Sequence, residues 1–230
     1  DRESEMPDEF LGLYRELLNS RAAKGMSNSE AALAAGLWAA HREGVDIDYC
    51  SLTDYFCASR NSRDLDRLKD NLLAADALLV SGPVYFGDRG SLVHELIQMI
   101  RTDSDLQEHL RGKLYAGIAV GAKRNGGQET TLIYQILDMV ALGLRAVGND
   151  RETTAQYGGT CHAGDLGTLT KDSHGIGTAM GTGRRIANLL NMFDYHAELN
   201  DKINVLFLIL QESKDIAKNY VNELVERHSG

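Results

Sequence analysis

Residues 74–87, which read A-A-D-A-L-L-V-S-G-P-V-Y-F-G, decide the fold class of this chain. The apolar run at 77–80 has the length of a buried strand, and it ends abruptly in Ser81, Gly82 and Pro83. In an open α/β sheet, ligands bind in the crevice beyond the carboxyl ends of the strands. A loop there that combines a rigid proline, an aromatic pair and small residues is suited to holding a flat ring system. We therefore expect a buried strand that leads directly into a binding loop.

Outward from this stretch, apolar strand-like runs alternate with helix-like segments. This pattern is typical of a parallel sheet with helices on both faces. The strands are expected at residues 45–49, 77–80 and 114–120, with a short piece starting at 146. The helices are expected at residues 30–43, 64–75, 91–101, 129–144 and 172–190. The elements together predict an α/β domain with three layers, α/β/α, around a doubly wound parallel sheet.

The two ends of the chain fit this scheme less easily. A doubly wound sheet should begin with a central strand, yet residues 9–19 read as a helix at least as well as a strand. The most apolar run, 203–210, lies near the other end of the chain. It either supplies the central strand of the sheet in a permuted order, adds an edge strand, or joins a partner subunit. The sequence leaves these alternatives open. The expected divisions are an extension at 1–19, a domain at 20–190, and a segment at 191–230 that completes the sheet or mediates oligomerisation.

Composition and charge exclude several classes of protein. At 230 residues, with 43% hydrophobic and 25% charged residues, the chain matches one globular domain or a domain with an extension. Its net charge of −9 argues against nucleic acid as the main partner, because phosphate neutralisation needs a basic face. No apolar run approaches the roughly 18 residues of a membrane span, and no signal-peptide pattern is visible, although a leader removed before Asp1 stays an open alternative. The scattered Cys50, Cys57 and Cys161 favour a reducing cytoplasm over a disulfide framework.

Two further loops share the context of the loop at 81–87. The first, at 20–29, reads S-R-A-A-K-G-M-S-N-S and precedes a helix. Hydroxyls, free amides and two cations at a helix N-terminus form an anion site, although a simple helix cap is the alternative reading. The third, at 121–130, contains Gly126 and Gly127, which permit close backbone approach to a ligand, or else form a flexible surface turn.

The loop at 81–87 also has an ordinary alternative, in which Tyr85 and Phe86 pack on the core of the protein. What favours a shared site is position. Each of the three loops is expected to follow a strand and precede a helix, so that all three converge at one edge of the sheet. The first loop is not a phosphate-binding Walker A motif, because the pattern G-x-x-x-x-G-K-[ST] is missing.

With these three loops, the chain resembles the NAD(P)H-dependent FMN reductase family of flavodoxin-like proteins, which includes iron–sulfur flavoprotein and quinone reductase relatives. The motifs are S-R-x-x-K-G-x-S-N-S, A-D-A-L-L-V-S-G-P-V-Y-F-G and G-K-L-Y-A-G-I-A-V-G-A-K-R-N-G-G-Q-E-T-T-L, and the match covers roughly residues 20–190. The resemblance implies a flavodoxin-like fold and a noncovalent FMN reduced by NAD(P)H. It also implies a second, small-molecule electron acceptor, and a homodimer or homotetramer with flavin sites at subunit boundaries.

The resemblance also implies the contacts of the cofactor. The FMN phosphate would rest on Ser20, Arg21, Ser27, Asn28 and Ser29. The isoalloxazine would lie against Pro83, Val84, Tyr85, Phe86 and Gly87. The third loop would follow its other edge with Gly121, Lys123, Arg124, Gly126, Gly127 and Gln128, and both cations in it are candidates to attract the nicotinamide phosphates.

The chain departs from the iron–sulfur relatives in its cysteines. Only Cys57 stands where those relatives carry a compact cluster, and because four thiolates are normally needed, we expect no iron–sulfur centre. Cys161 and His162 are adjacent in sequence, and because adjacent side chains rarely face each other, we expect no catalytic dyad. With Asp165 and His174 they also lack zinc spacing, so we expect no metal. The resemblance implies that their loop, 158–167, covers the flavin or the nicotinamide.

The predicted function is that of an FMN-dependent oxidoreductase without a dedicated acid–base residue, since the cofactor carries the chemistry. The sequence leaves two alternatives open. The chain could be an FMN-binding electron carrier without pyridine-nucleotide activity. It could also be a flavin-free interaction module that keeps only the fold.

Overall fold

The computed structural model describes residues 27–56, 64–153 and 155–199 of the chain. Contacts divide the chain into two compact units, Asp1–Asp194 and Tyr195–Gly230, and the sheet lies in the first. Several predictions therefore fall outside the described residues: the segment at 9–19, the phosphate contacts Ser20 and Arg21, Cys57, and the apolar run at 203–210.

The sheet is built around two long parallel strands. β1 (Ala77–Tyr85) pairs with β3 (Leu114–Gly121), in a register that runs from Ala77 opposite Leu114 to Pro83 opposite Val120. The other edge of β3 carries two short parallel strands, β4 (Arg145–Ala146) at its beginning and β5 (Gly159–His162) at its carboxyl half. β2 (Asp88–Arg89) turns back antiparallel on the end of β1. The order is β2-β1-β3-β4, which confirms the predicted, mostly parallel sheet.

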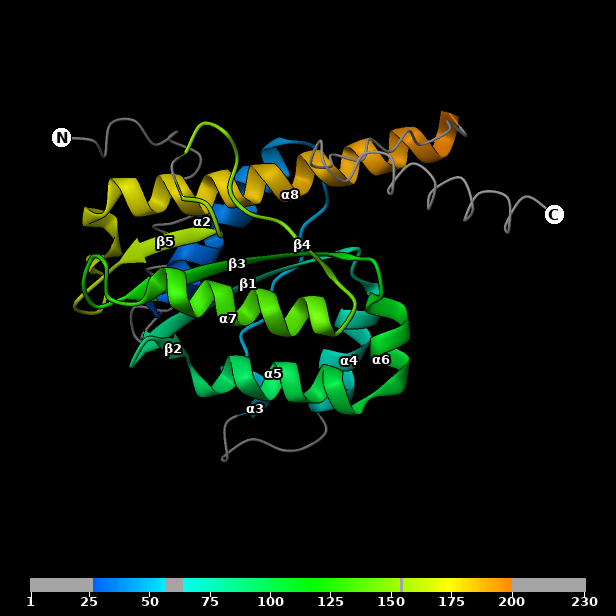
Figure 1. The fold of residues 1–230 in the computed structure, drawn as a ribbon, viewed down its shortest axis with the longest axis horizontal. Coiled ribbons are helices and arrows are strands. Elements are labelled where there is room, and N and C mark those ends of the chain that lie inside the picture. Colours follow the sequence, from blue (N-terminus) through cyan, green and yellow to red (C-terminus); the bar gives the residue numbers. More distant parts are fainter. Residues whose placement is uncertain (1–26, 57–63, 154, 200–230) are drawn as a thin grey trace, which may run out of the picture. The chain divides into compact units, whose positions relative to one another are not determined.

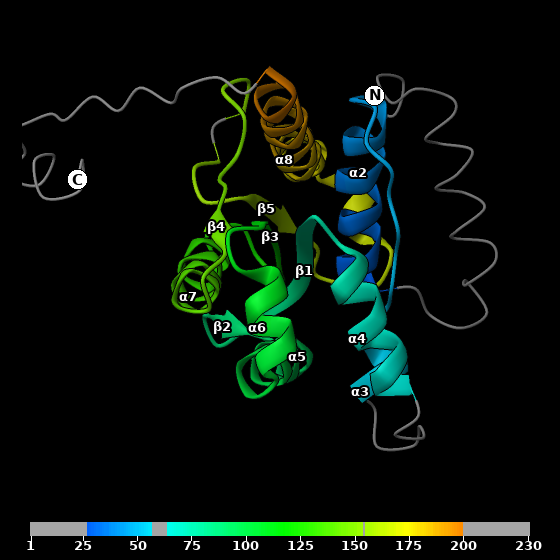
Figure 2. The ribbon, with the colours of Figure 1, turned by 90° about the vertical axis from the view of Figure 1, so that its right-hand side faces the viewer.

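Helices cover both faces of this sheet (Figures 1 and 2). One face carries α2 (Asn28–Arg42) and α8 (Ser173–Leu199). The other side carries α4 (Asp64–Ala74), α5 (Ser91–Thr102), α6 (Ser104–Leu110) and α7 (Gln128–Ala141). Two short pieces, α3 (Thr53–Phe56) and the 3₁₀ turn η2 (Thr168–Lys171), complete the described elements. The three-layer α/β/α, flavodoxin-like fold class is confirmed.

The alternation of side chains along β3 explains the layers, because successive residues of a strand point to opposite faces. Ile118 and Val120 pack with α2 and α8 in one buried cluster. Tyr115 packs in a second cluster with α5, α6 and α7. Every residue of β3 is buried, as expected for a central strand covered on both faces.

Small residues bring α2 and α8 close together. The buried face of α2 consists of alanines and Gly36, as the Ala-rich sequence at 30–43 suggests. A Cβ atom added to Gly183 in α8 would overlap the carbonyl oxygen of Gly36, so the two backbones touch there. The helix pair therefore depends on the absence of a side chain at this crossing.

The structure corrects three element predictions. The expected strand at 45–49 is wrong, since this segment carries no regular structure. A strand needs a ladder partner, and none of the described strands pairs with it. The helix expected to end at residue 190 continues to Leu199 as α8. Helix α7 ends at Ala141, three residues earlier than expected, because Gly143 adopts φ 93° and turns the chain into β4.

Candidate functional site

The three predicted loops meet at the carboxyl edge of the parallel strands. The Ser81 hydroxyl donates a hydrogen bond of 2.8 Å to the Ser29 carbonyl, joining the second loop to the first. A Cβ atom added to Gly127 would lie 2.7 Å from the Cα of Gly87, so the third loop touches the second. Gly127 adopts φ 101°, a conformation that favours glycine. Close approach of these loops thus depends on residues that the sequence singles out.

A fourth segment, at 163–167, joins the same edge. The Asn28 amide donates to the Asp165 carbonyl at 2.9 Å, and the Gly167 N–H donates to the Asn28 side-chain oxygen at 3.1 Å. The Ala163 N–H donates to the Gly121 carbonyl at 2.9 Å, which fixes the segment beside the end of β3. This is part of the loop that was expected to cover the cofactor, and the structure places it next to the first and third loops.

A hollow of about 2010 Å³ opens at this edge and continues along the side of β1 that faces away from β3. Its carboxyl end is lined by Ser27, Asn28, Ser29, Pro83, Val84, Tyr85, Ala122 and Gly164. Ligand pockets usually measure about 300–1,000 Å³. One cofactor would therefore fill only part of the hollow, and its carboxyl end is the part that the first and second loops line. Arg124, Gly127 and Gln128 of the third loop line a separate, smaller hollow of about 350 Å³.

The aromatic pair of the second loop stands free of the protein core. Phe86 and Gly87 form a two-residue hairpin loop between β1 and β2, with φ 53° and 77°, as in a type I′ turn. Tyr85 is 60% exposed and Phe86 is fully exposed, so the alternative that both pack on the core is wrong. Two exposed aromatic rings beside Pro83 suit the flat ring of FMN, which would cover apolar surface that the fold leaves open.

The first loop ends in a helix cap. The Ser27 hydroxyl accepts from the Glu30 N–H at 3.2 Å, and the Glu30 carboxylate accepts from the Ser27 N–H at 2.9 Å, which is a capping box. The predicted phosphate contacts Ser27 and Asn28 thus use their side chains to fix the loop. What the first turn of α2 still offers an anion is its backbone N–H groups and the positive end of the helix dipole.

Glu30 is ionised at neutral pH. Burial alone would raise the pKa of its carboxyl, but hydrogen bonds from the Ser27 backbone and from the hydroxyl groups of Tyr49, Ser51 and Ser27 lower the pKa below its ordinary value. The Tyr49 hydroxyl lies 2.8 Å from the carboxylate. A negative charge therefore sits in the first turn of α2, and a phosphate there would need the cations of the first loop as well.

Gln128 shapes the third loop instead of facing a ligand. Its buried side chain donates to the Lys123 carbonyl at 2.7 Å and to the Cys161 carbonyl at 3.1 Å, and it accepts from the Gly126 N–H at 2.8 Å. A Cβ atom on Gly121 would meet this side chain at 2.6 Å. The glycine at the end of β3 therefore makes room for the glutamine that closes the loop. The spacing of the two residues was visible in the sequence, but this contact was not.

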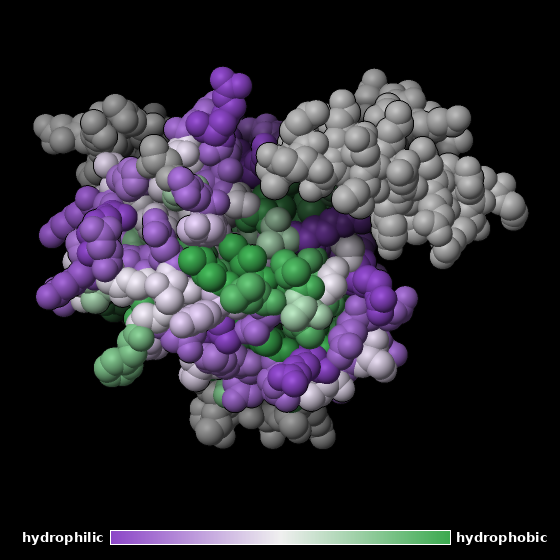
Figure 3. Space-filling model, in the orientation of Figure 1, coloured by the Kyte–Doolittle hydropathy of each residue, from purple (hydrophilic) through white to green (hydrophobic). Residues whose placement is uncertain are grey.

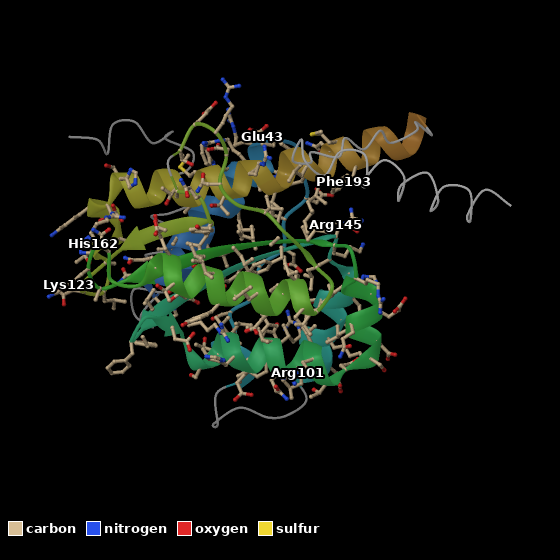
Figure 4. All side chains as sticks on the ribbon, viewed as in Figure 1. Glu43, Arg101, Lys123, Arg145, His162 and Phe193 are labelled. Atoms are coloured by element: carbon tan, nitrogen blue, oxygen red, sulfur yellow. The ribbon has the colours of Figure 1, made fainter. Side chains whose placement is uncertain are left out.

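The two cations of the third loop differ in what surrounds them. The Arg124 guanidinium donates to the Thr160 carbonyl at 3.0 Å and pairs with the carboxylate of Asp172, so its charge is compensated. Lys123 is exposed and lies at the same end of the sheet as His162 (Figure 4). Both residues are exposed, and Lys123 is the one whose charge no carboxylate of the described residues compensates.

Cys161 is placed for structure and not for catalysis. Its thiol is buried, donates to the Gly175 carbonyl at 3.2 Å, and has its pKa raised by burial and by the charge of Asp172. Asp172 also accepts from the His162 N–H at 2.6 Å. In the described ranges, no group of three or more His, Cys, Asp or Glu side chains is arranged to hold a metal ion. The prediction that the chain lacks an iron–sulfur centre stays a prediction, since Cys57 lies outside those ranges.

A parallel three-layer fold whose loops gather around an open carboxyl edge defines a flavodoxin-like protein. Residues 17–150 match the family of NADPH-dependent FMN reductases, and the chain belongs to this family. It is therefore a flavoprotein oxidoreductase with FMN as its cofactor. The predicted family, fold class and cofactor are confirmed.

Similar proteins agree with this assignment. An iron–sulfur flavoprotein of Methanocaldococcus jannaschii is 31% identical over 163 residues, which cover 65% of this chain and 83% of that protein. An iron–sulfur flavoprotein of Methanosarcina thermophila is 27% identical over 64% of this chain and 68% of that protein. A WrbA-like flavodoxin structure from Agrobacterium tumefaciens superposes with a TM-score of 0.50 at 18% identity, over 70% of this chain and 88% of that one, which supports the fold. In the part of the chain that the structure describes, no helix is long and apolar enough to cross a membrane.

Proposed function

We propose that this oxidoreductase takes reducing equivalents from NADPH or NADH and passes them to a second, small-molecule acceptor such as a quinone or a free flavin. FMN held beside Pro83, Val84 and Tyr85 would supply the hydride and electron-transfer chemistry of this reaction. The observation that carries the proposal is the convergence of Ser29, Gly87 and Gly127 at one open edge. Family membership supports the choice of the nicotinamide as donor.

Different residues at the carboxyl edge of the sheet would contact different parts of the flavin. Pro83, Val84 and Tyr85 line the hollow and would hold the flavin there, and the exposed Phe86 next to them would shield it from water. Gln128 holds the third loop in shape and accepts the Gly126 N–H itself, so the donors toward the flavin would be other backbone N–H groups of this loop. Donors near the ring stabilise negative charge that develops on it during reduction.

Lys123 is the residue that we assign to the nicotinamide phosphates. It is exposed at the carboxyl edge, whereas the charge of Arg124 is already compensated by Asp172. A lysine ammonium attracts phosphate as a point charge, without the fixed geometry of an arginine. The preference between NADPH and NADH depends on such a contact, since only NADPH carries the additional phosphate.

Anaerobic stopped-flow mixing tests the proposal. The FMN-loaded protein is mixed with NADPH or NADH, and bleaching of the bound flavin is followed. We expect bleaching that saturates with nicotinamide concentration, and a several-fold higher half-saturation concentration in Lys123→Gln. Arg101→Gln is the matched control, because Arg101 is an exposed cation on α5, away from the carboxyl edge (Figure 4).

Each contrary outcome has a meaning. A yellow protein that neither nicotinamide bleaches is an FMN-binding electron carrier and not a reductase. A protein that stays colourless when FMN is added is an interaction module that keeps only the fold. Equal effects of the two substitutions would remove Lys123 from the nicotinamide site and leave the rest of the proposal standing.

A further inference from the structure

A buried carboxylate joins three segments at the carboxyl edge of the sheet. The Asp172 side chain is 6% exposed and stands immediately before α8. It accepts hydrogen bonds from the Gly175 N–H at 3.0 Å, in the first turn of α8, and from the His162 N–H at 2.6 Å, at the end of β5. It also pairs with the Arg124 guanidinium of the third loop, which donates in addition to the Thr160 carbonyl at 3.0 Å. Both the position of the third loop and its charge therefore depend on Asp172.

Exposed charges lie around this ion pair. Lys123, Asp165 and Lys171 are exposed, and Figure 3 shows a mostly hydrophilic surface at the end of the molecule where Figure 4 labels Lys123 and His162. Water and salt screen interactions between exposed charges, whereas buried charges are screened much less. Because Asp172 is buried, its charge acts on the third loop with little screening.

We propose that Asp172 sets the reduction potential of the bound flavin by neutralising the charge of Arg124. Reduction adds two electrons and one proton to FMN, so the ring gains one negative charge. An uncompensated guanidinium in the third loop would stabilise this charge and make the flavin easier to reduce. Pairing with Asp172 weakens this effect, which lowers the potential and makes the reduced flavin a stronger electron donor. The inference rests on FMN bound at the carboxyl edge, and it does not depend on which donor reduces the flavin.

Redox titration of the FMN-loaded full chain with dithionite, against a reference dye, tests this role without a nicotinamide. We expect Asp172→Asn to increase the preference for reduced over oxidised FMN about tenfold, which corresponds to a rise of about 30 mV in the two-electron potential. Arg124→Gln should lower the potential, because the carboxylate is then uncompensated. The double variant with both substitutions should return towards the wild-type potential. Arg124→Lys keeps the positive charge and should stay close to the wild type.

A second ion pair on α8 provides the matched control. The Arg184 guanidinium donates to the Asp150 carboxylate at 2.7 and 2.9 Å, and the Asp150 side chain is 13% exposed. Arg184 lies roughly 16 Å along α8 from its first residue, since each helical residue adds about 1.5 Å, and therefore stands away from the carboxyl edge. Asp150→Asn breaks a pair of the same kind. We expect it to destabilise the FMN-free protein in urea without shifting the potential of the bound flavin.

The direction of the shifts separates an effect of charge from an effect of structure. If Asp172 only held the third loop in place, both single variants would loosen the loop and shift the potential in the same direction. That result, an unchanged potential in Asp172→Asn, or an equal shift in Asp150→Asn would each overturn the proposal. If Asp172→Asn does not fold, the Arg124 variants decide, because equal potentials of Arg124→Gln and Arg124→Lys would overturn it as well. None of these outcomes involves NADPH or NADH, so the stopped-flow experiment tests the nicotinamide donor separately.

Discussion

Phe86 occupies a backbone conformation that suits a different residue. It adopts φ 53°, where β-carbon-bearing side chains are strained, and it is followed by Gly87 at φ 77°. Type I′ turns favour Asn-Gly at these two positions. Packing does not offset this strain, because the Phe86 side chain is fully exposed and does not pack in the core. Strain retained without a packing gain is a mark of functional sites.

Replacing Phe86 by asparagine should therefore separate stability from binding. We expect Phe86→Asn to raise the free energy of unfolding of the FMN-free protein by about 1 kcal/mol, because asparagine tolerates the left-handed region. The affinity for FMN should fall several-fold, because an aromatic contact is lost. Urea unfolding and a fluorescence titration with FMN measure the two quantities. An unchanged affinity would remove Phe86 from the flavin site.

Glu30, at the start of α2, makes a pH-dependent contribution to the free energy of unfolding. The pKa of its carboxyl is lower in the folded state than in the unfolded state, where it is about 4.3. The ionised carboxylate therefore stabilises the fold at a pH above the unfolded-state pKa, and this stabilisation is lost as the pH falls through the folded-state pKa. Glu30→Gln keeps an acceptor for the capping box but removes the charge. We expect it to be about 0.5–1 kcal/mol less stable than the wild type at pH 7.

The difference in the free energy of unfolding between the Glu30→Gln variant and the wild type should shrink as the pH falls below about 4, where the carboxylate takes up its proton. Urea unfolding of both proteins across this range measures it. A difference that stays constant down to pH 3 would show that Glu30 acts through its shape and not through its charge.

The residue types along the sequence predicted where the site lies better than they predicted what each side chain does there. Gly127 and the exposed aromatic pair stand where the second and third loops meet, as expected from their positions after strands. Asn28 and Gln128 were expected to face the cofactor, yet their side chains hold loops together. A polar side chain next to a ligand loop satisfies the backbone of that loop or the ligand, and only the three-dimensional contacts decide which.

At the scale of elements, periodicity and apolar runs predicted what the core requires. β1 and β3 were found because a strand covered on both faces must be continuously apolar. β5 was not predicted, since its four residues carry no such run. The segment at 45–49 alternates like a strand but has no ladder partner among the described strands. Pairing depends on the rest of the sheet, which a local pattern does not contain.

Two glycines in α8 give a matched test of the contact between α2 and α8. A Cβ atom at Gly183 would overlap the Gly36 carbonyl, whereas nothing lies within 4 Å of one at Gly177. We expect Gly183→Ala to destabilise the protein by about 2 kcal/mol through overpacking. Gly177→Ala should stabilise it by about 0.5–1 kcal/mol, as usual for a helix interior.

Thermal or urea unfolding compares these two variants with the wild type. The same chemical change in the same helix removes differences in helix propensity from the comparison. Equal effects at the two positions would show that α2 and α8 do not pack as closely as the Gly36–Gly183 crossing implies.

At the scale of the whole molecule, the site is a junction of segments that are far apart in the sequence. Asn28 contacts the segment at 163–167, and Ser81 contacts Ser29, although more than 50 residues separate the partners in each case. The sheet brings them together by placing the carboxyl ends of its parallel strands at one edge. A ligand at this junction links loops from both halves of the chain and should stabilise the fold as a unit.

FMN should therefore raise the melting temperature of the protein, and riboflavin should raise it less. At a concentration of FMN about 100 times its dissociation constant, linkage gives about 2.7 kcal/mol. For a chain of this size that corresponds to a shift of about 5–10 °C. Riboflavin lacks the phosphate, so at the same concentration it keeps the ring contacts of the second and third loops and loses the anion contacts at the start of α2.

Differential scanning fluorimetry with each ligand measures both shifts. Gly127→Val is the control for the site, because a side chain there would press the third loop against Gly87, and we expect it to abolish the shift with either ligand. Equal shifts with FMN and riboflavin would mean that the α2 terminus does not bind the phosphate. An FMN shift that persists in Gly127→Val would place the flavin away from the junction of the second and third loops.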